Sequence, residues 1–144
     1  MILVDDHVLA AHIGGSRAVG PEGGGLATTG AWWWRLSQAL DRLGGPPFAV
    51  DGLAASVVVL DQARLLPAMS RLASAYRLGV VAAEALAAAE ALGADIVAGQ
   101  DTPRLREAAR VRGVTYLVQP DPRAGLVGWS PRTAAPSSSP SSPR

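Results

Sequence analysis

The chain has 144 residues, a net charge of +1 and 49% hydrophobic residues, which is enough apolar material for one packed domain. All 13 basic residues are arginine and cysteine is absent, which excludes disulfides, thiolate zinc sites and any phosphate-binding loop that depends on lysine. The near-neutral balance also lacks the strongly basic character of proteins that bind nucleic acid over a broad surface.

The sequence shows neither a secretory signal nor a membrane span. The apolar residues after Met1 meet Asp5 and Asp6 at once, without a basic segment before them. The apolar stretches are also far shorter than the roughly 20 residues that a membrane helix needs. We therefore expect a cytoplasmic protein that does not contact a membrane.

Strand and helix signals alternate along the chain, which predicts an α/β fold of three layers, α/β/α, around a central parallel sheet. The spacing of apolar residues predicts strands at 2–4, 95–98 and 114–118, and either a strand or a buried turn of helix at 56–60. It predicts helices at 7–13, 31–43, 62–77, 82–92 and 103–112. Helix-capping preferences place Thr28 or Thr29 before the second helix, Gly79 after the third and Thr102 before the last.

The composition divides the chain into one domain and a tail. Residues 1–128 are expected to form the α/β domain, with a long glycine-rich loop at 14–25. Residues 129–144 are rich in serine and proline, so they cannot bury enough apolar surface to offset the entropy lost on ordering. We therefore expect this tail to be disordered.

Three acidic residues follow or adjoin elements that meet at the carboxyl edge of the expected sheet, where open α/β sheets bind ligands. They are Asp5, Glu84 and Asp101. Carboxylates that converge from distant parts of a chain are typical ligands for Mg²⁺. Two of the residues also have a simpler interpretation: Asp101 can cap a helix, and Glu84 can interact favourably with the dipole of its own helix from the first turn. Asp5 is different, because a carboxylate that ends a buried strand is costly unless it is paired or functional.

The three consecutive tryptophans Trp32, Trp33 and Trp34 fall in a predicted helix. At about 100° per residue they cannot all face one core, so at least one must be exposed or meet a partner. Packing against a protein partner or a second copy of the chain is favoured over base stacking. The arginines at 104, 106, 110 and 112 form either a phosphate-binding patch or an ordinary solvated helix face.

Parts of the chain resemble the PIN domain, the fold of many prokaryotic toxin ribonucleases. The residues that carry the resemblance are the opening Met1-Ile2-Leu3-Val4-Asp5 with 8–10, then 84–98, Asp101, 105–109 and 113–114. The stretch 27–40, with Thr28-Thr29-Gly30 and Arg35-Leu36, also looks like an actinobacterial PIN-like subgroup.

The resemblance implies an endoribonuclease that depends on Mg²⁺ or Mn²⁺, as the toxin of a toxin–antitoxin pair. Asp5, Glu84 and Asp101 would then be its catalytic and metal-binding carboxylates. RNA would be the substrate. An antitoxin, another protein docked on the tryptophans, or a second copy of the chain would be the partner.

The chain departs from the PIN pattern in several ways that bear on activity, one of which is an extra residue between the strand at 95–98 and Asp101. Asp6 replaces the hydroxyl residue that usually follows the first aspartate, and the short spacing from Glu84 to the next glycine places Ala82 at the acidic position of a strict alignment. A PIN-like module without nuclease activity is therefore the alternative function.

The middle glutamate of active members is also missing. No glutamate lies between Glu22 and Glu84, so Asp41 or Asp51 would have to substitute.

A second resemblance is to the response-regulator receiver. Leu3-Val4-Asp5-Asp6-His7 looks like its Mg²⁺-binding opening, and Val57-Val58-Val59-Leu60-Asp61 looks like the strand that carries its phosphate-accepting aspartate. The receiver needs a lysine near Gln100, which this chain lacks, and has no place for a strand at 114–118. A degenerate receiver is the remaining alternative.

Overall fold

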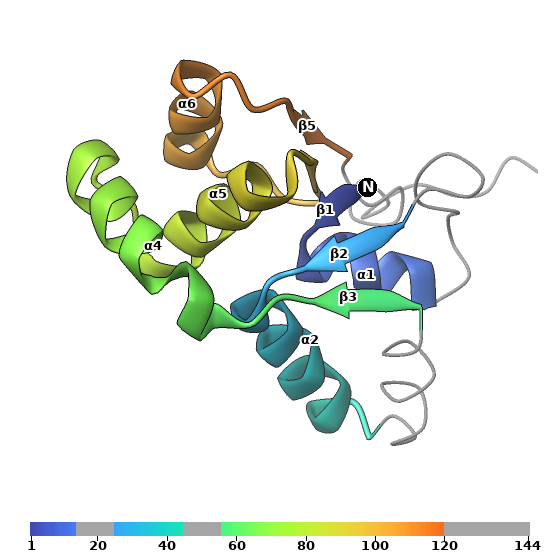
Figure 1. Ribbon diagram of the computed structural model, residues 1–144. Helices are drawn as coiled ribbons and strands as arrows, with labels where there is room; N and C mark the ends of the chain where they lie inside the picture. The colour runs from blue at the N-terminus through green and yellow to red at the C-terminus, as the bar shows by residue number, and fades with distance from the viewer. Residues whose placement is uncertain (14–24, 45–55, 120–144) are drawn as a thin grey trace, which may run out of the picture.

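The computed structural model describes residues 1–13, 25–44 and 56–119. Within these ranges it contains five strands and five helices (Figure 1). In chain order they are β1 Ile2–Val4, α1 Asp6–Ile13, β2 Leu26–Thr28, α2 Gly30–Arg42, β3 Val57–Val59, α4 Gln62–Tyr76, α5 Val80–Leu92, β4 Asp95–Ala98, α6 Pro103–Val111 and β5 Tyr116–Val118.

The strands form one parallel sheet in the order β3-β2-β1-β4-β5. In the register of the central strands, Leu3 lies opposite Ala27 on β2 and Ile96 on β4. The chain therefore runs outward from β1 to β3, returns to the other side of β1, and runs outward again to β5. This is a doubly wound fold, as the alternation of strands and helices predicts.

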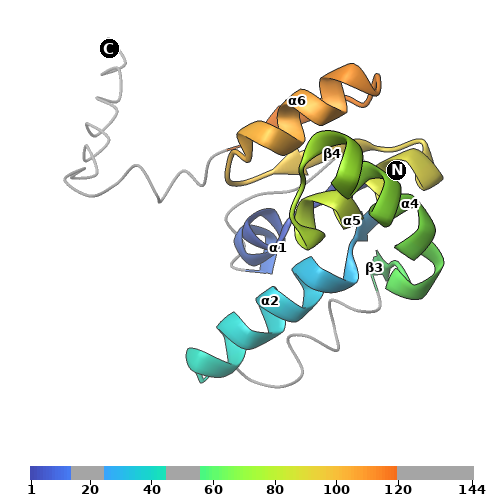
Figure 2. The ribbon, with the colours of Figure 1, turned by 90° about the vertical axis from the view of Figure 1, so that its left-hand side faces the viewer.

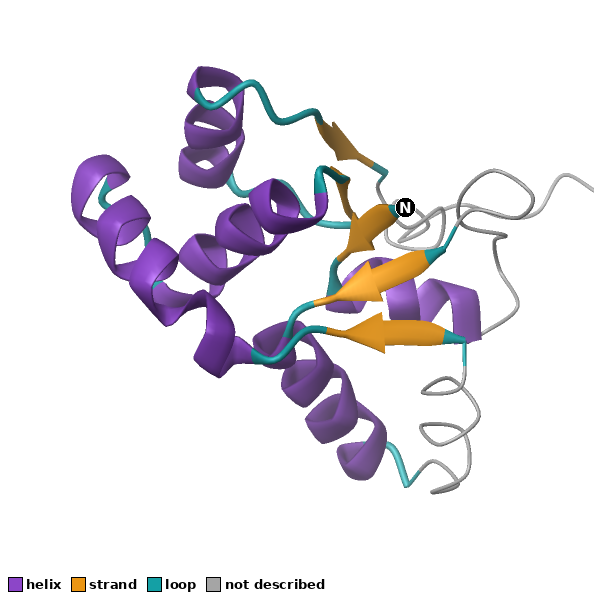
Figure 3. Cartoon of the chain, in the orientation of Figure 1, coloured by secondary structure: helices purple, strands orange, loops and turns teal. Residues whose placement is uncertain are grey.

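Alternate strand residues point into two separate hydrophobic clusters, because side chains alternate across a strand. Leu3 and Ile96 pack with residues of α4, α5 and α6, whereas Val4 and Val97 pack with residues of α1 and α2. The helices thus cover both faces of the sheet (Figures 2 and 3). Helix α5 lies between α4 and the strands (Figure 1). The three-layer α/β/α prediction is confirmed.

The topology creates one switch point, between β1 and β4. The chain leaves β1 toward α1 on one face of the sheet and leaves β4 toward α6 on the other face. Loops that diverge in this way leave a crevice at the carboxyl ends of the two strands, where doubly wound folds bind their ligands. Residues 5 and 99–102 form these two loop segments.

Several predicted elements need correction. The interior strand β2 was not predicted, because Leu26–Thr28 is three residues long and contains only one large apolar side chain. Helix α4 ends at Tyr76 with Arg77 in the left-handed conformation, so Gly79 is not its terminus but the residue that precedes α5. Helix α5 begins at Val80, two residues before the predicted start at 82, and β5 covers only the last part of the predicted strand at 114–118.

Of the remaining predictions, some are confirmed and others concern residues that the structure does not describe. The stretch 56–60 forms strand β3, and Thr29 caps α2 by accepting the N–H of Trp32. Most of the glycine-rich loop, residues 14–24, and the end of the expected domain with the tail, residues 120–144, lie outside the described residues. In the described part, no single helix is long and apolar enough to cross a membrane, and the α4–α5 pair reaches that length only across a bend of 117°.

Candidate functional site

Asp5 follows β1 directly and lies in the crevice at the switch point. Its side chain is buried, with 3% of its residue surface exposed. Oδ1 accepts the N–H of Val8 at 2.8 Å, and Oδ2 accepts the N–H groups of Gly99 at 2.8 Å and Gln100 at 3.4 Å. The carboxylate therefore joins the start of α1 to the loop that leaves β4, and three backbone donors occupy it.

Burial raises the pKa of Asp5 above its ordinary value of 3.8, and the hydrogen bonds from Val8, Gly99 and Gln100 only partly oppose this effect. The cause is that a carboxylate loses hydration when it is buried, which disfavours its charged form. Asp5 is thus a perturbed acid in a crevice at the switch point, which is the pattern of a functional-site candidate.

Asp6 begins α1 beside Asp5 and pairs with an arginine from a neighbouring helix. Its Oδ2 lies 3.4 Å from Nε of Arg35 on α2 and 4.0 Å from Nε2 of His7. Its Oδ1 is buried without a hydrogen-bond partner. Asp5, Asp6, His7 and Arg35 line a small pocket of about 30 Å³. That volume is enough for a water molecule, which would satisfy the free oxygen.

Glu84 lies elsewhere, in the second turn of α5 rather than in the first turn that the sequence predicts. It is fully buried, and its Oε2 accepts the N–H of Ala31 at 3.1 Å. Its Oε1 has no hydrogen-bond partner and would lie 3.4 Å from a Cβ at Gly30. The carboxylate therefore caps the N-terminus of α2, whose free N–H groups and dipole favour an anion.

Asp101 is held by an arginine of α6. Nη1 of Arg106 lies 2.7 Å from its Oδ2. The N–H of the neighbouring Thr102 donates to the hydroxyl of Tyr116 at 3.0 Å, and that hydroxyl donates to the carbonyl of Gln100 at 3.5 Å. Burial raises the pKa of Tyr116 as well. Thr102 precedes α6 as predicted, but its side chain makes no capping hydrogen bond.

The structure does not gather Asp5, Glu84 and Asp101 into one metal-binding group. Among residues 1–13, 25–44 and 56–119, no three acidic or imidazole side chains lie close enough together to hold a metal ion. Each of the three carboxylates instead binds its own partner, which is backbone for Asp5 and Glu84 and a guanidinium for Asp101. In the described residues these three carboxylates are thus engaged separately and do not form one shared site.

The proposed substitutes for the missing glutamate do not change this outcome. Asp41 is exposed in the last turn of α2, whereas the N-terminus of α2 adjoins the carboxyl edge of the sheet. Asp51 lies outside the described residues.

The receiver alternative fails on topology. Receivers and flavodoxin-like folds place their strands in the order 2-1-3-4-5, whereas this sheet has β3 at its edge. Asp61 follows that edge strand, is exposed, and caps α4 by accepting the N–H of Ala63 at 3.0 Å.

The three tryptophans have three different environments. Trp32 is buried among residues of α5 and α6, Trp33 is partly buried against the cluster under α1, and Trp34 is 60% exposed. The prediction that at least one tryptophan leaves the core is confirmed.

The four arginines on α6 or directly after it each have a different partner. Arg106 pairs with Asp101, Arg110 with Glu107 and Arg112 with Glu90, while Arg104 donates to the carbonyl of Arg77 at 3.3 Å. Three of the four charges are thus balanced by carboxylates. This arrangement favours a solvated face over a phosphate patch.

A second, larger hollow of about 340 Å³ adjoins the small pocket and shares four of its residues. It is mostly apolar, and its lining comprises Trp32, Arg35, Gly79, Val80, Val81, Ala82, Thr102 and Leu105. Sequence reasoning missed Arg35, Gly99 and Tyr116 as residues of this region. Only Gly99 left a signal, because a glycine directly after a strand often marks a close approach of two backbones.

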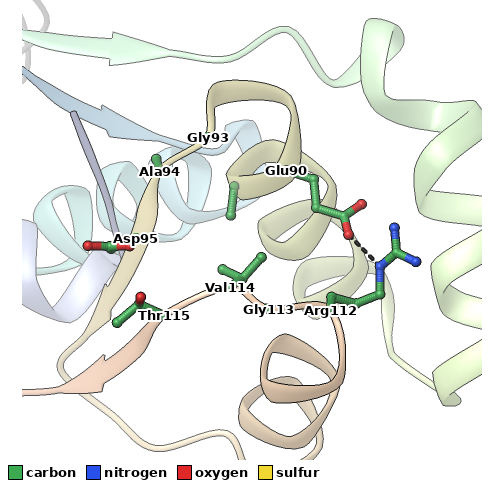
Figure 4. A pocket seen from close by; sticks show the side chains of 9 residues that line it. Glu90, Gly93, Ala94, Asp95, Arg112, Gly113, Val114 and Thr115 are labelled. Atoms are coloured by element: carbon green, nitrogen blue, oxygen red, sulfur yellow. Dashed lines mark hydrogen bonds and ion pairs between the residues drawn. The ribbon is translucent and has the colours of Figure 1, made fainter.

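A third hollow, of about 460 Å³, lies at the opposite, amino edge of β4 and β5 (Figure 4). Glu90 and Arg112 form an ion pair across it, joining the ends of α5 and α6. The lining is largely polar and contains no buried group without a partner. We therefore place the candidate site at the carboxyl edge.

These features define a doubly wound α/β/α domain with a crevice at its switch point that is lined by Asp5 and Asp6. The solved structure of PAE2754 from Pyrobaculum aerophilum has a similar fold, with a TM-score of 0.53 and 23% sequence identity over 81% of this chain and 90% of that chain. At this identity the likeness shows the fold alone. Comparisons with protein-family models and with curated proteins gave no match.

Proposed function

We propose that this chain is a non-catalytic interaction module built on a PIN-like plan. The observation that carries the proposal is that each of the three carboxylates expected to hold a metal already serves the fold. Asp5 ties β1 to the loop after β4, Glu84 caps α2, and Asp101 pairs with Arg106. Freeing Asp5 or Glu84 for a metal would leave buried or partly buried backbone N–H groups without an acceptor, which is costly.

The exposed Trp34 is the contact that we assign to a protein partner of this module. Its neighbours Trp32 and Trp33 anchor α2 to the two hydrophobic clusters, so the helix presents Trp34 on a fixed support. Tryptophan is enriched among the residues that dominate binding energy at protein interfaces. A rigid helix carrying one exposed tryptophan also loses little conformational entropy on binding.

A metal-dependent ribonuclease is the second candidate, and one observation favours it. Asp5 and Asp6 line the same small pocket, and Oδ1 of Asp6 is buried there without a hydrogen-bond partner. An unpartnered carboxylate oxygen in a crevice is a place where a cation could replace a water molecule.

Calorimetric titration with Mn²⁺ and Mg²⁺, together with an RNA cleavage assay, separates the two candidates. For the interaction module we expect no stoichiometric metal binding at millimolar concentration and no cleavage above that of an Asp5→Ala variant. Metal binding that is lost in Asp101→Ala, with cleavage that needs Asp5, would establish the nuclease instead.

A further inference from the structure

We infer that the chain's own segment at residues 126–129, Leu126-Val127-Gly128-Trp129, docks in the apolar hollow beside the switch-point pocket. This inference goes beyond the proposed function and does not depend on whether a metal binds. The segment lies outside the described residues, so the proposal rests on the hollow, on where the described chain leaves the fold, and on the sequence of the segment.

The hollow has the size and lining of a binding site for apolar side chains. Its volume of about 340 Å³ lies within the usual range for ligand sites, roughly 300–1,000 Å³. Val81, Ala82 and Leu105 supply apolar surface, and Val80 at its rim is 65% exposed. Val80 thus extends the apolar lining of the hollow to the protein surface.

The described chain leaves the fold at the same edge as the hollow. Strand β5 is parallel to β4, and the N–H of Gln119 still donates to the carbonyl of Ala98 at 2.7 Å. Ala98 and Tyr116 line the small pocket, which shares Trp32 and Thr102 with the hollow. The residues after 119 therefore start beside the site.

The length of the connection suits docking within one chain. The seven residue-to-residue steps from Gln119 to Leu126 span up to roughly 23 Å at about 3.3 Å each, and neighbouring strands are only about 4.8 Å apart. A short tether within one chain gives an effective concentration of about the millimolar range, so an apolar contact with a Kd of that order is substantially occupied.

The sequence of the segment suits the hollow better than the rest of the tail does. Leu126, Val127 and Trp129 stand between Asp121-Pro122-Arg123 and a tract of serine and proline. They are the large apolar side chains of residues 120–144. The two other hollows suit them less, because the one at the amino edge is polar and the one between α4 and α5 is separated from the strands by α5.

The test uses the full chain, which has no cysteine, so one introduced cysteine carries a unique spin label. With the label at Ser130→Cys, we expect the amide signals of Val80, Val81 and Leu105 to lose roughly half of their intensity or more, because the tethered segment keeps the label close to them. The same label at Ser141→Cys is the control and should leave these signals nearly unchanged. Adding Leu126→Asp and Trp129→Ala to the Ser130→Cys chain should restore the intensity.

Three results would overturn the inference. The Ser130→Cys label could leave the signals of Val80, Val81 and Leu105 unaffected, or the effect could persist after Leu126→Asp and Trp129→Ala. The third result comes from mixing the labelled chain with an unlabelled, isotope-enriched chain. An equal loss of intensity on the second chain would assign the hollow to a second copy of the protein.

Discussion

The backbone N–H of Gly99 donates to Oδ2 of Asp5 at 2.8 Å across the switch point of the sheet. At this point the loop after β4 passes so close to α1 that a Cβ at residue 99 would lie 2.5 Å from Cβ of His7 and 3.2 Å from the backbone nitrogen of Val8. The carboxylate and the glycine therefore depend on each other. Asp5 needs the donor, and the donor reaches Asp5 only because residue 99 has no side chain.

The first prediction concerns this close approach. We expect Gly99→Ala to lower the free energy of unfolding by about 1–3 kcal/mol, because the added methyl group must displace the backbone of α1. Gly25→Ala is the matched control, since its Cβ would make an ordinary contact at 3.5 Å with the flexible end of Met1. Urea unfolding of both variants measures the difference. Equal stabilities would contradict the structure at this point.

The second prediction concerns pH. Burial raises the pKa of Asp5 above 3.8, so the folded chain holds the Asp5 proton more tightly than the unfolded chain does. The stability that this group contributes is thus fully present below pH 3.8 and is lost as the pH rises through the raised pKa. In Asp5→Asn, position 5 does not titrate. We expect the stability advantage of the wild type over this variant to shrink toward neutral pH in unfolding curves. An advantage that grows with pH would show that folding lowers the pKa of Asp5 instead of raising it.

The third prediction separates a helix cap from a metal ligand at Glu84. Glu84→Gln keeps an acceptor for the N–H of Ala31, so we expect a smaller loss of stability than in Glu84→Ala. Glu84→Ala leaves that donor without its acceptor and should lower the free energy of unfolding by about 1–3 kcal/mol. The measurement is thermal or urea unfolding in metal-free buffer. A large loss in Glu84→Gln would mean that the charge itself is needed.

The fourth prediction concerns the tryptophans of α2. Trp32→Ala opens a cavity in the core and should cost about 3–5 kcal/mol of stability, whereas Trp34→Ala on the exposed side should change it by less than about 0.5 kcal/mol. Unfolding measured by circular dichroism compares the two. A large loss of stability in Trp34→Ala would indicate that Trp34 is packed within the fold and is not free for a partner.

The sequence was sufficient to predict the class of fold, but it did not predict strand β2, which lies between β1 and β3. The apolar runs at 2–4 and 96–98 and the alanine-rich helix predict a parallel α/β sheet, because burial on both faces leaves a continuous apolar pattern. Strand β2 escaped prediction because Leu26–Thr28 is buried by its position between β1 and β3, not by its own hydrophobicity. The buried Thr28 compensates for its polarity by donating its hydroxyl to the carbonyl of Val4 at 2.8 Å.

The candidate site was predicted only at Asp5, which does lie buried at a strand end. Glu84 and Asp101 have the expected residue type, but their partners come from residues 53 positions and 5 positions away. Because α5 begins at residue 80 and not at residue 82, Glu84 lies in its second turn, where its carboxylate reaches the N-terminus of α2. Such pairings depend on how helices pack, and one sequence carries no pattern that marks them.

The most direct test of the interaction module is calorimetric titration of the wild type with Mn²⁺ beside Asp5→Asn and Asp101→Ala. If the carboxylates serve the fold, the wild type will show no stoichiometric binding at millimolar Mn²⁺ and will match both variants. One Mn²⁺ bound per chain in the wild type, and lost in both variants, would contradict the proposal and place a metal centre at the switch point.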